Sequence, residues 1–141
     1  MLFRSYSFLY SGISAANYHL DEVLLVDVAK YLIQQYVVTG LVAQRKVPQT
    51  ESGLTTILGF VAQACNSIAN MGFIAGGIWR GAQVASLKPG DAVQNGFYIA
   101  SGTMADQSAA DRAARVTPPI YVALLSSGAI EHVVVNVFIT R

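Results

Sequence analysis

The chain has 141 residues, of which 53% are hydrophobic and only 12% are charged, and its net charge is +1. This length suits one domain with its own core, and the charged fraction is about half of that in typical soluble proteins. The small net charge predicts no basic surface for nucleic acid or anionic lipid. A chain so poor in charge is expected either to enter a membrane or to cover much of its surface with protein neighbours.

The membrane alternative rests on residues 52–79, which contain no charged side chain and are numerous enough to cross a bilayer. Polar residues nevertheless recur there at helical spacing: Gln63, Asn66, Ser67 and Asn70. Apolar residues fill the opposite stripe: Leu54, Ile57, Leu58, Val61, Cys65 and Ile68. The pattern therefore predicts an amphipathic helix with an uncharged polar face rather than a membrane span.

Cys65 is the single cysteine and lies on this apolar stripe. One cysteine cannot form an intrachain disulfide, which suits a reducing compartment. Its place on the stripe favours a small core residue over a reactive thiol. Residues 1–10 contain no continuous apolar stretch followed by a cleavage site, so no signal peptide is predicted.

The first half of the chain predicts one strand and one long helix. Residues 5–10 are rich in aromatic residues and read as a strand. A helix is expected from about 21 to 39, with Asp21 and Glu22 in its first turn and Gly40 just beyond its end. Its apolar residues are so numerous that most of its circumference should be covered.

A second helix is expected to be capped by Thr50 or Ser52 and to run to about Met71. Turn signals dominate the segment that follows it. An Asn-Gly pair at 95–96 predicts a tight turn that leads into a strand at 97–99.

Residues 108–115 predict a short helix that the following Pro-Pro pair ends, with Asp111 and Arg115 as an i, i+4 pair. Together with Asp106 and Arg112 they form the densest charged group of the chain. We interpret this group as an ion-pair network, either within the domain or at an interface between subunits.

Two strands are expected to close the chain, at 120–125 and 130–140, joined as a hairpin at 126–128. Both faces of the second strand are largely apolar. It therefore fits either the centre of a covered sheet or an edge that pairs with another subunit. Taken together, the elements predict an α+β fold with two long helices packed on a small, mainly antiparallel sheet with a C-terminal hairpin.

Residues that usually carry catalysis or bind metals are scarce. His19 and His132 have no metal-ligand spacing to another His or Cys, and neither a Gly-x-Ser-x-Gly elbow nor a P-loop occurs. Trp79, with Phe73 and Ile78, is expected to pack rather than to hold a ligand. We therefore expect no catalytic residues, no cofactor and no metal, and a protein that is not an enzyme.

Five segments, in order, resemble the C-terminal part of a family of phage tail proteins of the contractile-sheath type. They are 46–53 (KVPQTESG), 71–79 (MGFIAGGIW), 87–91 (LKPGD) with 96–98 (GFY), 107–115 (QSAADRAAR) with 118–120 (PPI), and 128–132 (GAIEH) leading to Arg141. Residues 6–12 (YSFLYSG) also resemble the strand that enters this region. The resemblance covers nearly the whole chain and implies a single domain, 1–141.

This resemblance implies a virion structural protein of a phage tail, assembled in the cytoplasm of the bacterial host. Its subunits would stack in helical rings around a rigid tube, linked by strands exchanged from the chain termini. The implied partners are copies of the chain itself, the tail tube protein, and baseplate or terminator proteins, with no nucleic acid and no membrane.

The subunit-interface residues that we expect lie in the terminal strands and the charged group: Phe8, Tyr10, Val133, Val135, Val137, Phe138, Ile139, Arg112 and Arg115. Two other classes of function stay open. One is a small tail adaptor, terminator or binding module that docks a partner without polymerising. The other is a soluble enzyme, for which no nucleophile, acid–base pair or metal site is suitably spaced.

Overall fold

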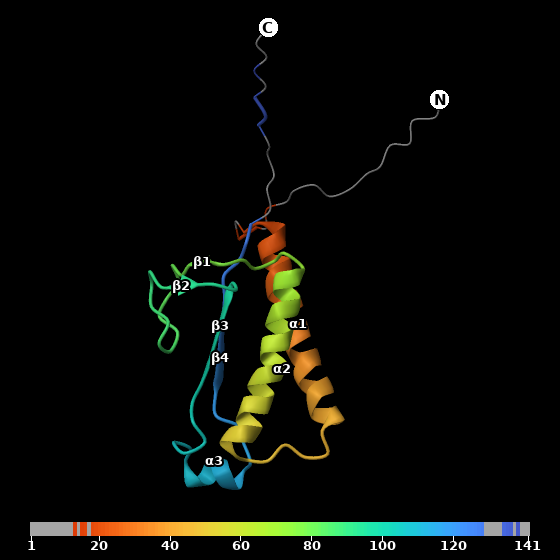
Figure 1. The fold of residues 1–141 in the computed structure, drawn as a ribbon, viewed down its shortest axis with the longest axis vertical. Coiled ribbons are helices and arrows are strands. Elements are labelled where there is room, and N and C mark those ends of the chain that lie inside the picture. Colours follow the sequence, from red (N-terminus) through yellow and green to blue (C-terminus); the bar gives the residue numbers. More distant parts are fainter. Residues whose placement is uncertain (1–12, 14, 17, 129–133, 137, 139–141) are drawn as a thin grey trace, which may run out of the picture.

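The structure, a computed structural model, describes residues 13, 15–16, 18–128, 134–136 and 138. Two long helices dominate it, α1 (Leu20–Ala43) and α2 (Glu51–Asn70). They lie side by side in opposite directions and are joined by a short connection at the lower end of the molecule (Figure 1). Both helices occur where the sequence predicts them.

The strands form two small antiparallel sheets beside the helices. β3 (Phe97–Ser101) pairs with β4 (Ile120–Leu124), and β1 (Gly77–Ile78) pairs with β2 (Ala92–Val93). The β3–β4 pair runs along the helices, whereas β1 and β2 belong to a lobe near the upper end (Figure 1). The expected α+β fold, with two long helices on small antiparallel sheets, is confirmed.

Helix α1 begins as the sequence predicts but ends later. The backbone N–H of His19 donates to Glu22 Oε2 at 3.3 Å, and Asp21 and Glu22 occupy the first turn, where carboxylates suit the helix dipole. The expectation that Gly40 lies beyond the helix is wrong, because α1 continues past it. Gly40 instead lets α2 approach closely, since a Cβ at this position would lie 2.6 Å from the ring of Phe60.

Helix α2 is amphipathic, as its polar and apolar stripes predict. Thr50 caps it, with Oγ1 accepting a hydrogen bond from Gly53 N at 3.3 Å. Four residues of the predicted apolar stripe are buried: Leu54, Val61, Cys65 and Ile68. Three residues of the polar stripe are exposed: Gln63, Asn66 and Asn70. The uncharged polar face therefore lies on the surface of the chain.

The core consists of two hydrophobic clusters. The first joins Leu25 and Ala29 of α1 to Ile68 of α2, with Phe97 and Leu124 packed against it from the sheet. The second consists of Leu87, Val93 and Ala123, with Trp79, Val84 and Tyr98 packed against them. Because successive side chains of a strand point to opposite faces, β3 and β4 each contribute to both clusters.

Trp79 packs in the second cluster, as predicted, and its Nε1 donates to Ala82 O at 2.8 Å. Phe73 packs against the first cluster instead, and Ile78 is 51% exposed. These three neighbours in sequence therefore do not form one packed group.

The predicted short helix is α3 (Ala109–Ala113), at the lower end of the molecule (Figure 1). Ser108 caps it: its Oγ accepts from Asp111 N at 3.0 Å and donates to Asp111 Oδ2 at 2.6 Å. Arg115 lies beyond the helix with a φ of 56°, in the left-handed region. The expected i, i+4 pair of Asp111 and Arg115 is therefore wrong, because the helix ends before its second member.

The predicted strand at 120–125 is confirmed by β4, and the Asn-Gly turn at 95–96 leads into β3 as expected. The strand predicted at 5–10 lies outside the described residues, as does most of the one predicted at 130–140. Residues 134–136 and 138, which are described, do not belong to a strand.

Candidate subunit interface

One edge of β4 makes no backbone hydrogen bonds in the part of the chain that the structure describes. Leu125 N donates to Gly96 O at 2.7 Å, and this bond extends the β3–β4 ladder. Since alternate residues of an antiparallel strand face its partner, the odd-numbered residues of β4 bond to β3. The even-numbered ones direct their N–H and C=O groups to the opposite edge: Ile120, Val122 and Leu124.

A largely apolar groove of about 440 Å³ runs between α1 and β4. Its lining includes Leu25, Val26, Ala29, Ile33, Val122 and Leu124. The groove has a simple cause, because paired helices lie about 8–10 Å apart whereas paired strands lie about 4.8 Å apart. Two strands are therefore too narrow to cover two helices, and the uncovered width lies beside the open edge of β4.

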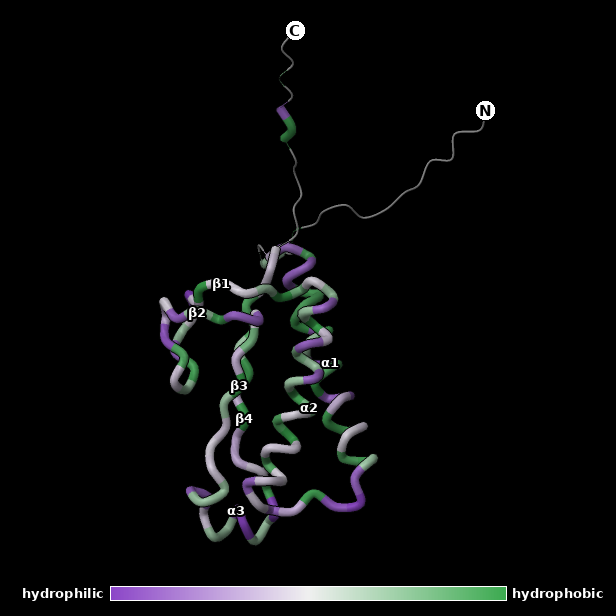
Figure 2. The backbone as a smooth tube through the Cα atoms, in the orientation of Figure 1, coloured by the Kyte–Doolittle hydropathy of each residue, from purple (hydrophilic) through white to green (hydrophobic). Residues whose placement is uncertain are grey.

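Helix α1 contains hydrophobic residues along its length (Figure 2), and many of them are exposed. Its exposed large hydrophobic residues are Leu20, Val23, Leu24, Val26, Tyr31, Val38, Leu41 and Val42. Only Leu25 and Ala29 of this helix are buried. The sequence predicts that most of the circumference of α1 is covered, and the described chain by itself does not cover it.

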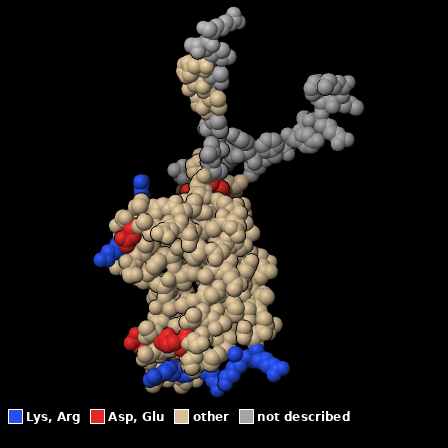
Figure 3. Space-filling model, in the orientation of Figure 1, with Lys and Arg blue, Asp and Glu red and all other residues tan. Residues whose placement is uncertain are grey.

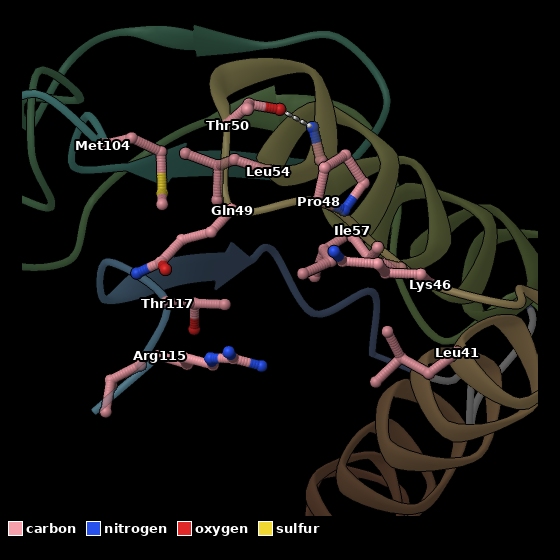
Figure 4. A pocket seen from close by; sticks show the side chains of 13 residues that line it. Leu41, Lys46, Pro48, Gln49, Thr50, Leu54, Ile57, Met104, Arg115 and Thr117 are labelled. Carbon is pink, nitrogen blue, oxygen red and sulfur yellow. Dashed lines mark hydrogen bonds between the residues drawn. The ribbon is translucent and has the colours of Figure 1, made fainter. Parts of the chain in front are cut away.

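A second cavity, of about 430 Å³, lies at the lower end of the molecule between the α1–α2 connection and the segment after α3 (Figure 4). Its apolar walls include Leu41, Val47, Leu54, Ile57 and Met104. Lys46 and Arg115 approach it from opposite sides, one from the connection and the other from the segment after α3 (Figure 4). We call this cavity the lower pocket.

Hydrogen bonds between distant segments hold the lower pocket together. Gln49 Nε2 donates to Arg112 O at 3.1 Å and so ties the α1–α2 connection to α3. Met104 N donates to Glu51 Oε1 at 2.7 Å, which ties the segment after β3 to the start of α2. The walls of the pocket are therefore set by contacts that are remote in sequence.

The lower pocket is positive. Its lining contains Lys46 and Arg115 but no acidic residue. Nearby carboxylates accept hydrogen bonds: Glu51 from Met104 N, Asp106 Oδ2 from Thr103 Oγ1 at 2.6 Å, and Asp111 from the cap of α3. Basic side chains consequently dominate the lowest part of the surface in Figure 3.

Among the described residues, no group of three or more His, Cys, Asp and Glu side chains could hold a metal ion. Over the same residues, no helix combines the length and the apolar character that crossing a membrane requires. Cys65 is fully buried, and this burial raises the pKa of its thiol to about 11. The thiol therefore stays protonated at neutral pH, as expected for a core cysteine.

The structure describes four of the predicted interface residues. Arg112 and Arg115 are exposed at the lower end, and Arg115 lines the lower pocket. Val135 and Phe138 are 75% and 93% exposed. The other five lie outside the described residues: Phe8, Tyr10, Val133, Val137 and Ile139.

The open edge of β4 and the lower pocket were not predicted. The strand itself was expected, but as the hairpin partner of a strand at 130–140; its pairing with β3 was not expected, so neither was the position of its open edge. Lys46 belongs to the expected connection between the helices, and no periodic pattern relates it to Arg115. A search of the sequence for basic residues beside turn residues would have found both Lys46 and Arg115. It would not have shown that the two line the same pocket.

A family model described as E217 tail sheath protein gp31-like, C-terminal domain, matches residues 20–139 of the chain. The matched region therefore includes both long helices, both sheets and the lower pocket. No curated protein matches the chain.

Proposed function

Because the chain belongs to the E217 tail sheath protein gp31-like family, through the C-terminal domain, we propose that it is a subunit of a contractile phage tail sheath. The family indicates a structural protein of a phage tail. The proposal adds that copies of the chain assemble in stacked rings around the tail tube. It also adds that adjacent subunits are linked by exchanged strands.

The observation that carries this proposal is the open edge of β4. The backbone groups of Ile120, Val122 and Leu124 can bond to an incoming strand, which would extend the β3–β4 sheet by one strand. That strand would also fill the groove between β4 and α1 with alternate side chains. An incoming strand would therefore gain both main-chain hydrogen bonds and contact with an apolar surface at this edge.

We assign this edge to a terminal segment of an adjacent copy, either residues 5–10 or residues 130–140. Both segments are rich in aromatic or β-branched residues. Val135 and Phe138 are exposed in the described chain, and full burial of such a side chain stabilises by roughly 1.5–3 kcal/mol. A strand link suits a contractile assembly, because ladder bonds can persist while the connecting segments bend.

The exposed apolar face of α1 also supports assembly. Large contiguous apolar patches on a soluble chain usually mark contacts with other proteins. In a sheath, this face would be covered by the tail tube protein or by neighbouring subunits. The uncharged polar face of α2 fits the same setting, because it can be buried without the cost of desolvating ionised groups.

Negative-stain electron microscopy of the purified protein tests the proposal. A sheath subunit is expected to form tubes or stacked rings at high protein concentration, and light scattering should show association. Discrete particles of fixed size would favour a non-polymerising tail adaptor or terminator instead. A monodisperse monomer that does not associate at any concentration would contradict both.

A further inference from the structure

On the face drawn in Figure 3, charged side chains gather near the two ends of the described body, whereas Asp27 and Lys30 lie within the length of α1. Figure 3 shows the middle of this face without charge, both acidic and basic residues at the upper end, and basic residues along the lowest edge with acidic ones just above them. The upper end contains the first turn of α1, with Asp21 and Glu22. The lower end contains Arg45 and Lys46 of the α1–α2 connection, and Arg112 and Arg115 in and after α3.

The basic residues of the lower end form no ion pair with other described residues. The carboxylates beside them accept hydrogen bonds from their own loops, as described above for Asp106 and Asp111. Lys46 and Arg115 in addition flank a cavity whose remaining walls are mainly apolar. Such a pocket suits a segment that presents an apolar side chain next to a carboxylate.

The first turn of α1 is such a segment. Tyr18 is 59% exposed and Leu20 is 45% exposed, and Asp21 and Glu22 follow directly. The bond that Glu22 accepts from His19 N does not exclude a second partner, because a carboxylate can accept several hydrogen bonds. The segment is thus opposite in charge to the lower pocket and similar to it in apolar character.

We propose that the lower pocket of one subunit binds the first turn of α1 of a second copy of the chain. Lys46 and Arg115 then face Asp21 and Glu22, and Leu20 enters the apolar part of the pocket. The two surfaces lie at opposite ends of the long axis of the body (Figure 1). The contact is therefore heterologous and can repeat in one direction, which produces a polar stack rather than a closed dimer.

This inference rests on the proposed sheath role, for which it identifies a contact between stacked subunits. The contact is distinct from the strand link at β4, since it involves side chains of folded elements and not the chain termini. Arg115 has a left-handed backbone because it directly follows the C-cap of α3, where Val116 N donates to Asp111 O at 3.1 Å and Arg115 N donates to Arg112 O at 3.2 Å. That conformation directs the guanidinium towards the pocket (Figure 4).

Cysteine cross-linking tests the contact directly. Leu20→Cys and Thr117→Cys place thiols at two exposed positions, one on the first turn of α1 and one in the lining of the lower pocket. Oxidation of a mixture of the two variants should give cross-linked dimers, whereas either variant alone should not. Absence of a cross-link in the mixture would overturn the inference, and so would equal cross-linking of one variant alone.

Charge reversal gives an independent test. Lys46→Glu combined with Arg115→Glu should raise the protein concentration needed for assembly about tenfold, and Asp21→Lys with Glu22→Lys should do the same. Mixing the two double variants should restore assembly in part, because every contact between unlike variants then joins opposite charges, whereas contacts between like variants still repel. Arg80→Glu, an exposed reversal outside the pocket, is the matched control and should assemble like the parent.

The two tests separate this inference from the sheath role. If the parent forms tubes and both double variants form them equally well, the stacking contact is wrong while the sheath role stands. If the parent forms no tubes but the cysteine mixture cross-links, the sheath role is wrong while the head-to-tail contact stands. If the parent forms no tubes and the mixture does not cross-link, both are wrong.

Discussion

Gly40 of α1 lies directly against the ring of Phe60 in α2, so that a Cβ at residue 40 would come within 2.6 Å of three ring carbons. Helical glycine normally destabilises a helix by about 0.5–1 kcal/mol relative to alanine. Its presence inside α1 therefore reflects the close approach of the two helices.

Replacing this glycine is the first test of the helix pair. Gly40→Ala should destabilise the protein by about 1–3 kcal/mol, because the added methyl group overpacks the contact with Phe60. Gly59→Ala is a matched control within α2, since a Cβ there meets no atom within 4 Å. Thermal unfolding should show a lower Tm for Gly40→Ala and an unchanged or higher Tm for Gly59→Ala. Equal effects would show that the contact with Phe60 does not limit the approach of the helices.

The stability of the protein should fall in the alkaline range because of Cys65. Burial raises the pKa of this thiol from 9.0 to about 11, so the folded state holds the proton more tightly than the unfolded state. The contribution is therefore fully present below pH 9.0 and is lost as the pH rises towards about 11. Denaturant unfolding at several pH values measures it, and Cys65→Ala should lack this part of the pH dependence. A parent and variant with the same alkaline profile would contradict the assignment.

Proline substitutions distinguish the two edges of β4. Val122→Pro removes an N–H that points to the open edge, so the folded subunit should keep its Tm while assembly is lost. Ala123→Pro removes a donor of the β3–β4 ladder and should destabilise the subunit itself. Unfolding curves and electron microscopy of both variants check this. Normal tubes from Val122→Pro would rule out strand addition at this edge.

Deletion of residues 133–141 should abolish polymers while α1 and α2 stay folded. The reason is that residues 130–140 are one of the two segments proposed for the strand link, whereas the two core clusters of the described residues contain none of its described members, 134–136 and 138. Circular dichroism should show retained helix, and electron microscopy should show discrete particles. Val135→Pro should do nearly as much, since it removes a ladder donor. The decisive measurement is a structure of the assembled form, in which residues 130–140 should pair with a neighbouring subunit.

Arg112 and Arg115 should matter for assembly more than for folding. Their side chains make no ion pair with other described residues, so replacing both with alanine should change the Tm little. Assembly should weaken modestly, by on the order of 1 kcal/mol, as is typical of exposed charge pairs. A double variant that melts and assembles like the parent would show that these arginines have no interface role.

Much of the fold could be predicted from the sequence, because the relevant signals are local. The stripes of α2, the cap at Thr50 and the Asn-Gly turn before β3 each depend on residues within a few positions of one another. The two wrong expectations, at Gly40 and at the Asp111–Arg115 pair, also came from local rules. Contact with Phe60 overrode the tendency of glycine to end a helix, and the early end of α3 removed the i, i+4 geometry.

The sequence by itself determined the two helices, the strands β3 and β4, the buried cysteine and the scarcity of charge that indicates protein neighbours. Only the tertiary structure decided that β4 has an open edge beside α1, and that Lys46 and Arg115 flank one cavity. The physical reason is that periodicity and capping act between near neighbours in the chain. An unpaired strand edge, or a pocket between a helix connection and a distant turn, exists only once remote segments have packed together.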